Sequence, residues 1–253
     1  MVKPSNEDYN RWGVNVDYYN GLMMEYYSTF DLIKVSDFHT RPRARIYPAV
    51  KRVAETTLAV ALLVLLAPLF VLFMVAIRLD SPGPTLYRQT RIGKNGKPFT
   101  FYKFRSMYQN IDRSAHQDFL KAFVNGNVKN GKNGQGVFKP VKANQITPVG
   151  RFLRKTSLDE LPQLINIVKG EMSFIGPRPN VPAEVEEYQE WHMRRLDTLP
   201  GITGLAQING RSSIPFDHIV LYDIRYVESE SLLMDLRILW QTVPLVLRGK
   251  GAK

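Results

Sequence analysis

One apolar run constrains this chain more than any other feature of its sequence. Leu58 to Ile77 is a stretch of 20 residues without a charge, which is long enough to cross the hydrocarbon core of a bilayer. Pro68 stands in the middle of the run. Proline removes a backbone donor and clashes with the carbonyl four residues earlier, so a straight helix is not expected here. The sequence therefore predicts a helix, a break at Ala67 and Pro68, and a second helix.

The charges on the two flanks of this run bear on its topology. Lys and Arg accumulate in short cytoplasmic loops, so a spanning helix should carry them on one flank only. Here residues 41–57 are basic before the run, and a second group of cations follows it. Basic residues on both sides favour a re-entrant hairpin with both ends in the cytoplasm over the alternative, a span. The cations that follow the run include Arg88, Arg91, Lys94, Lys97, Lys103 and Arg105.

Charge and cysteine content narrow the classes of function. The formal net charge of +11 over 253 residues implies an anionic partner: nucleic acid, an anionic membrane surface or a phosphorylated substrate. An apolar anchor favours lipid head groups and phosphates among these. The chain has no cysteine, which excludes disulfides, thiolate zinc sites and a cysteine nucleophile. The four histidines are scattered without the spacing of metal ligands.

The remaining patterns predict a helix-rich α/β fold with a small irregular sheet. Asn95-Gly96 between two short β-like runs is a hairpin signal. The C-terminal apolar segment is too short and too interrupted to span a bilayer, so it packs on the core or lies in the membrane interface. The expected strands are 87–92 and 99–104, and the expected amphipathic or apolar helices are one starting near Pro48 and those at 112–123, 184–199 and 232–247.

Ser157-Leu158-Asp159-Glu160 allows two interpretations. It fits a capping box, in which Ser157 caps a helix and Glu160 reaches back, but Pro162 then falls inside that helix. A helix that begins at Asp159 tolerates Pro162 and places the Asp159 carboxylate at the positive end of the helix dipole, which lowers its pKa. An ionised aspartate beside a glutamate, with cations just upstream, suits attack on phosphorus with a divalent metal. Spacing alone favours the structural cap.

Several long motifs favour a catalytic role for Asp159 and Glu160 over the structural cap. In their order along the chain they resemble the bacterial sugar transferases, the monotopic polyprenyl-phosphate phosphoglycosyl transferases. The resemblance covers most of residues 53–252. It implies magnesium-dependent transfer of a sugar-1-phosphate from a UDP-sugar to undecaprenyl phosphate, with release of UMP. The matching stretches are SPGPTLYRQTRIGKNGKPFTFYKFRSM (81–107), VGRFLRKTSLDELPQLINIVKGEMSFIGPRP (149–179), PGITGLAQINGR (200–211), DIRYV (223–227) and LLMDLRILWQTVPLVLRGKGA (232–252).

The same resemblance assigns roles to residues of this sequence. Asp159 is implied to attack the β-phosphorus of the donor and to form a phosphosugar-aspartyl enzyme, which the lipid phosphate then resolves. Glu160 is the second carboxylate, and both are expected to hold Mg²⁺. The break at Ala67-Pro68 takes the place of a Ser-Pro pair that is common in the family. The implied substrate-binding residues are Lys103, Arg105, Arg154, Arg178, Arg211 and Asp223.

We therefore predict a monotopic membrane protein in three parts. Residues 1–45 form a polar, Tyr-rich extension, residues 46–80 the re-entrant helix-break-helix, and residues 81–253 a catalytic domain with interfacial helices on the cytoplasmic face of the bacterial inner membrane. Membrane lipids, a UDP-sugar and undecaprenyl phosphate are the expected partners, and nucleic acid is not. The competing hypotheses are a non-catalytic membrane scaffold, which requires no such carboxylates and arginines together, and a basic nucleic-acid binder, which leaves the apolar run unexplained.

Overall fold

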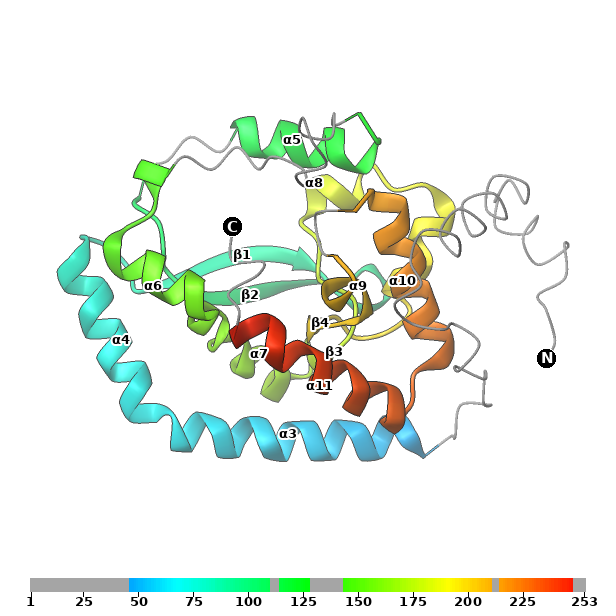
Figure 1. The fold of residues 1–253 in the computed structure, drawn as a ribbon, viewed down its shortest axis with the longest axis horizontal. Helices are drawn as coiled ribbons and strands as arrows, with labels where there is room; N and C mark the ends of the chain where they lie inside the picture. The colour runs from blue at the N-terminus through cyan, green and yellow to red at the C-terminus, as the bar shows by residue number, and fades with distance from the viewer. Residues whose placement is uncertain (1–45, 110–113, 128–142, 211–213, 248–253) are drawn as a thin grey trace, which may run out of the picture.

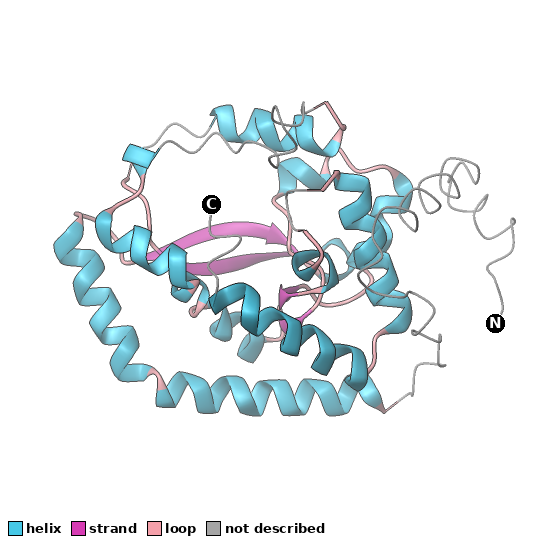
Figure 2. Ribbon diagram, in the orientation of Figure 1, coloured by secondary structure: helices cyan, strands magenta, loops and turns pink. Residues whose placement is uncertain are grey.

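The computed structural model describes residues 46–109, 114–127, 143–210 and 214–247. The predicted N-terminal extension and the candidate Arg211 lie outside the described residues. Within them, helices surround two small two-stranded sheets (Figures 1 and 2). The prediction of a helix-rich chain with a small sheet is confirmed.

The first sheet is the predicted hairpin. Strands β1 (Leu86–Ile92) and β2 (Pro98–Phe104) pair antiparallel, and Asn95 and Gly96 form the connection with positive φ values of 57° and 74°. Asn and Gly are the residues that adopt this left-handed conformation most readily, which is why the turn was visible in the sequence. The second sheet is smaller, with β3 (Ser173–Ile175) parallel to β4 (Gly201–Thr203).

The apolar run forms two helices, as predicted. Helix α3 (Tyr47–Leu65) and helix α4 (Ala67–Asp80) meet at Leu66 and are bent by 61° (Figure 1). Pro68 lies in the first turn of α4, where its missing N–H and fixed φ cost little. No single described helix is long and apolar enough to cross a membrane, whereas this bent pair meets that criterion when taken together.

Both helices of the bent pair also pack on the rest of the chain. Ala59 of α3 is buried against Phe101 of β2 and against the apolar side chains of α7 (Gln163–Lys169). Phe73 of α4 packs edge-on against Phe104 at a centroid distance of 5.8 Å, in a cluster that includes Leu153. The hairpin β1-β2 is therefore covered by the bent pair on one side.

The outward faces of α3, α4 and the last helix are apolar. Helix α11 (Leu232–Leu247) has the predicted bounds, and its Trp240 side chain is 81% exposed. Exposed apolar side chains on three helices form an amount of non-polar surface that is unusual for a protein in water. On these helices they include Val50, Val53, Val64, Leu65, Val71, Leu72, Val75, Leu79, Leu232, Leu233, Leu236 and Val243.

The predicted helix at 184–199 is wrong. The chain forms two short pieces instead, α8 (Pro182–Val185) and η5 (Glu190–Leu196), with Gln189 extended between them. Trp191 and His192 are both buried against Phe216, a contact that a continuous helix with one apolar face does not provide. The remaining helices of the described residues are the single turn η2 (Lys94–Gly96) inside the hairpin, α5 (Ser114–Val124), η3 (Ala143–Gln145), α6 (Pro148–Thr156), η4 (Leu158–Glu160), α9 (Leu205–Ile208) and α10 (Phe216–Ser229).

Candidate active site

A tight turn between α6 and η4 places the two candidate carboxylates. Thr147 caps α6 by accepting a hydrogen bond from the Gly150 amide at 3.0 Å, and Ser157 ends the helix in the left-handed conformation at φ 59°. A non-glycine residue in this conformation costs about 1–2 kcal/mol, so the packing around the turn must hold it. Asp159 and Glu160 follow directly in the single turn η4.

Both sequence interpretations of this segment are wrong in their local structure. The Ser157 side chain makes no capping hydrogen bond to any described residue, so no capping box forms. The following helix, α7, begins at Gln163 with Pro162 at its N-cap, and not at Asp159. Asp159 is therefore not at the start of a helix of several turns, and the dipole argument does not apply to it.

Two cationic side chains meet at the carboxylates. Lys103 Nζ of β2 lies 2.6 Å from Glu160 Oε1 and 3.7 Å from Asp159 Oδ2. Arg178 Nη1, from the loop after β3, lies 3.7 Å from the same Glu160 oxygen. The ion pairs hold Glu160 from two sides, while Asp159 is buried with a residual exposure of 8%. The site is thus assembled from a strand, a turn and a loop that are distant in the sequence.

Burial raises the pKa of the Asp159 carboxyl above its ordinary value. The positive charge of Lys103 lowers it, the negative charge of Glu160 raises it, and Arg154 and Arg178 lower it further. The prediction of a lowered pKa is wrong because desolvation outweighs the neighbouring cations here. Arg154 belongs to the site through its charge, since it stands in the last turn of α6 just before Asp159.

The carboxylate pair matches the chemistry of a magnesium site that a substrate completes. Mg²⁺ is usually bound by one or two carboxylates together with substrate phosphates and water. Asp159 and Glu160 supply two adjacent carboxylates, and across the part of the chain that the structure describes no group of three or more His, Asp or Glu side chains gathers at one point. The residues present fit a metal shared with a phosphate and not a site made of protein ligands alone.

Two predicted substrate-binding residues lie away from this cluster. Arg105 is buried, and its Nη2 donates to the Ser81 carbonyl at 2.6 Å and to Ser81 Oγ at 2.9 Å, beside the end of α4. Asp223 is fully buried in α10 and pairs with Arg195 at 2.5 Å. The structure thus brings together Lys103, Arg154, Asp159, Glu160 and Arg178 out of the predicted set, and leaves Arg105 and Asp223 outside it.

Two arginines near the cluster were not among the predicted site residues. Arg91 of β1 donates to the Pro179 carbonyl at 2.9 Å, and Arg195 of η5 donates to the Arg178 carbonyl at 3.3 Å. Arg91 was visible in the sequence only as one of several cations after the apolar run. Arg195 carried no signal, because it was one of several charged residues on the expected amphipathic helix 184–199.

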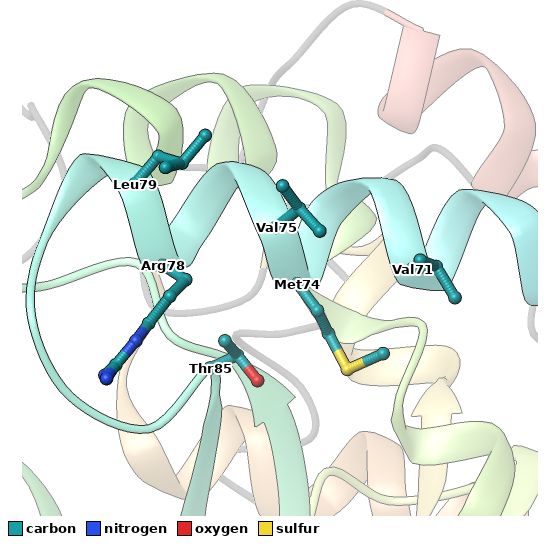
Figure 3. Close-up of a pocket in the computed structure, with 6 residues that line it drawn as sticks. All are labelled: Val71, Met74, Val75, Arg78, Leu79 and Thr85. Carbon is teal, nitrogen blue, oxygen red and sulfur yellow. The ribbon is translucent and has the colours of Figure 1, made fainter.

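A shallow apolar groove runs along α4. It has a volume of about 330 Å³ and is lined by Val71, Met74, Val75 and Leu79, with Arg78 and Thr85 at its end (Figure 3). The Arg78 guanidinium donates to the Gly83 carbonyl at 2.9 Å. An apolar groove that ends at a cation is complementary to an amphiphile with an apolar tail and an anionic head.

Comparison with known proteins decides the family. Residues 46–249 match the family described as bacterial sugar transferase. The chain belongs to that family. The resemblance drawn from the motifs is confirmed, and the family is by its description one of sugar transferases, a class of enzymes.

Three relatives show the range of the family. "Galactosyl transferase CpsE" of Streptococcus agalactiae is 41% identical over 204 residues, which are 80% of this chain and 43% of the relative. "Exopolysaccharide production protein ExoY" of Sinorhizobium fredii is 40% identical over 202 residues, 80% of this chain and 87% of the relative. "UDP-glucose:undecaprenyl-phosphate glucose-1-phosphate transferase" of Escherichia coli is 36% identical over 220 residues, 83% of this chain and 43% of the relative. The chain thus spans most of one relative and less than half of the other two.

Proposed function

We propose that this chain transfers a sugar-1-phosphate from a UDP-sugar to undecaprenyl phosphate and releases UMP. The observation that carries the proposal is the buried Asp159 beside Glu160, with Lys103 and Arg178 arranged around the pair, in a chain of this family. Relatives named for exopolysaccharide production and for undecaprenyl-phosphate sugar transfer support this as the first membrane step of a surface polysaccharide or glycoconjugate.

The proposed chemistry has two displacements at one phosphorus atom. An Asp159 carboxylate oxygen attacks the β-phosphorus of the UDP-sugar, and the bond from that phosphorus to the bridging oxygen breaks, so UMP leaves with the bonding electrons. The sugar phosphate is then an acyl phosphate of Asp159. A phosphate oxygen of the lipid attacks the same phosphorus, the Asp159 carboxylate leaves, and the product is the lipid diphosphate sugar.

The surrounding cations make the first attack feasible. A carboxylate is repelled by a diphosphate unless positive charge screens both, and Lys103, Arg154 and Arg178 supply that charge around Asp159. Asp159 and Glu160 would hold Mg²⁺, which supplies Lewis-acid stabilisation of the phosphoryl oxygens when it is bound. Partial burial of Asp159 strengthens each of these interactions because water is excluded.

We also propose that the chain sits on the cytoplasmic face of the bacterial inner membrane, with α3 and α4 as a re-entrant hairpin. The support is the 61° bend, the exposed apolar faces of α3, α4 and α11, and the groove along α4, which suits an isoprenoid chain with its phosphate toward Arg78. In this arrangement a water-soluble donor and a membrane-embedded acceptor both reach Asp159.

Release of UMP tests the function. Purified protein in nanodiscs with undecaprenyl phosphate should release UMP from one member of a panel of UDP-sugars when Mg²⁺ is present. EDTA should abolish the release, and added Mg²⁺ should restore it, because the two carboxylates need the cation to approach a diphosphate. A protein that binds the lipid but turns over no UDP-sugar would contradict the proposal and would favour the non-catalytic scaffold.

Single cysteines test the hairpin, since the chain has none of its own. We expect Arg45→Cys, just before α3, and Thr85→Cys, just after α4, to react with a membrane-impermeant maleimide in inverted inner-membrane vesicles and not in intact spheroplasts. Both ends of a re-entrant hairpin face the cytoplasm. Labelling of the two positions from opposite sides would show a span.

A further inference from the structure

The loop that carries Arg178 is held at every carbonyl oxygen from residue 177 to residue 180. Gly201 N–H donates to the Pro177 carbonyl, and Ile92 N–H donates to the Asn180 carbonyl, each at 2.9 Å. Between them, Arg195 Nη2 donates to the Arg178 carbonyl at 3.3 Å and Arg91 Nη1 to the Pro179 carbonyl at 2.9 Å. Four donors from β1, η5 and β4 thus converge on one short loop.

The sequence of the loop adds to this restraint. Pro177 and Pro179 fix their own φ angles, and each proline also restricts the residue before it to extended conformations. The strand that leads into the loop packs closely on its neighbour, since a Cβ on Gly201 would lie 2.1 Å from the Gly176 nitrogen. The backbone of Arg178 is therefore rigid, although its side chain is 47% exposed.

Arg195 is itself held by buried partners. Its Nη1 donates to the Tyr188 hydroxyl at 2.7 Å, and its Nη2 donates to Asp223 Oδ2 at 2.5 Å. The Arg195 and Asp223 side chains are 2% and 1% exposed. Burial raises the pKa of Asp223 to about 6, against the lowering effect of Arg195, so the carboxylate is ionised at neutral pH. The other Asp223 oxygen has no hydrogen-bond partner among the described residues. Among the described residues, the hydrogen-bond partner of the Asp223 carboxylate is therefore Arg195.

Arg91 is held in a comparable way on the other side of the loop. Its Nε and Nη2 donate to Gln89 Oε1 at 3.0 and 2.7 Å, and its guanidinium lies 5.3 Å from the centroid of the Phe101 ring. Lys103 Nζ lies 5.5 Å from the centroid of the same ring. The Phe101 ring therefore contacts both Lys103, which belongs to the site, and Arg91, which holds the Arg178 loop.

We propose that Arg91 and Arg195, the latter held by Asp223, are positioning residues that fix Arg178 opposite Glu160 before the donor binds. The inference rests on the proposed function and deepens it. Neither arginine needs to contact the substrate, and Asp223 acts on the site through Arg195 instead of binding substrate itself. Preorganised charge avoids reorganisation when the reaction occurs, which is the benefit of such an arrangement.

A double-mutant cycle tests this role. We expect Asp223→Asn to lower kcat/KM for the UDP-sugar roughly ten- to hundredfold, the size of effect that a small misplacement of a binding group produces. In an Arg178→Ala background the same substitution should change kcat/KM by less than about twofold, because effects that act through one residue are not additive. An equal fall in both backgrounds would show that Asp223 supports the fold only, and would overturn the proposal.

The matched control is Glu228→Gln. Glu228 pairs with Arg194 at 2.8 Å and joins the same two elements, η5 and α10, but it lies at the surface and does not contact the loop. Its loss should leave kcat/KM within about twofold of the wild type, since solvent screens exposed ion pairs and they contribute little. If Asp223→Asn does not fold, Arg91→Lys provides the same cycle, because it leaves the Arg195–Asp223 pair intact and removes the planar donor to Pro179.

Hydrogen exchange provides a readout that does not depend on activity. The four non-proline amides of residues 176–181 should exchange faster in Asp223→Asn and in Arg91→Lys than in the wild type or in Glu228→Gln. Unchanged exchange in the loop would overturn the proposal even if activity falls. Conversely, a wild-type protein that releases no UMP but shows the expected exchange pattern would contradict the proposed function and leave the positioning of Arg178 supported.

Discussion

Asp159→Asn should reduce UMP release by a factor on the order of 10⁴ or more, which is the scale seen when a catalytic nucleophile is removed. The amide has nearly the same shape as the carboxyl group but is not a nucleophile toward phosphorus. Lys103 keeps its 2.6 Å contact with Glu160 in the variant, so the geometry of the remaining site is preserved. Turnover of the UDP-sugar measured as UMP release in nanodiscs checks this result.

The same substitution should not weaken the fold. Because burial raises the pKa of Asp159, the ionised carboxylate is less favourable in the folded state than in the unfolded state at neutral pH, and a neutral amide removes that cost. We therefore expect an unchanged or higher midpoint of thermal unfolding. Asp118→Asn on the exposed side of α5 is the matched control, with wild-type activity and stability.

Intact-mass spectrometry separates the nucleophile from a role in binding. Wild-type protein incubated with the UDP-sugar and Mg²⁺, without undecaprenyl phosphate, should gain the mass of one sugar phosphate, whereas Asp159→Asn should gain none. A mass gain in the variant would assign the covalent step to another residue, and normal UMP release by the variant would exclude Asp159 as the nucleophile.

The parts of the fold that the sequence predicted depend on local chemistry. The β1-β2 hairpin follows from Asn95-Gly96, and the bend between α3 and α4 follows from Pro68. The break at residues 186–189 does not follow from any local pattern, because it results from the burial of Trp191 against α10. Tertiary packing overrides helical periodicity in such cases, which sequence periodicity alone does not detect.

The difference between local chemistry, which the sequence shows, and tertiary packing, which it does not, also applies to the site. The motifs singled out Lys103 and the Asp159-Glu160 pair, and ion pairs join these side chains in the structure. Arg105 was included with Lys103 because both residues belong to the stretch 81–107 that resembles the family. Strand β2 ends at Phe104, however, so Arg105 leaves the sheet and binds the carbonyl of Ser81. The direction of the Asp159 pKa shift depends on burial, which only the folded structure reveals.

The basic start of α3 shows how charge patterning misleads in another way. Lys51 and Arg52 belong to residues 41–57, the basic flank before the apolar run, and the positive charge of the chain predicted lipid head groups or phosphates as partners. Instead Arg52 donates to the Val168 carbonyl at the end of α7, at 3.2 Å, and the Lys51 side chain is turned into the domain. Their apolar neighbours Val50 and Val53 are the exposed residues on this part of the helix.

Lys51→Ala should therefore destabilise the protein by about 3–5 kcal/mol, the usual cost of removing one partner from a buried ion pair. Lys51 Nζ lies 2.8 Å from Asp235 and 3.1 Å from Glu230, and it donates to the Tyr226 hydroxyl at 2.7 Å. Without Lys51, two carboxylates that are each 6% exposed would face one another with no lysine between them. The cluster joins α3 to α10 and α11, so its loss should also loosen α3 from the domain.

Thermal unfolding in nanodiscs measures this effect, and we expect a fall in the midpoint of about 10 °C for a chain of this length. Lys121→Ala is the control, because Lys121 pairs with Glu187 at 3.7 Å at the surface and its side chain is 45% exposed. Loss of that pair should change the free energy of unfolding by less than about 1 kcal/mol. If the two lysine variants unfold at the same temperature, the Lys51 cluster does not anchor α3. If Asp235→Asn in the Lys51→Ala background recovers part of the stability, the cost lies in the uncompensated carboxylates, as the buried geometry requires.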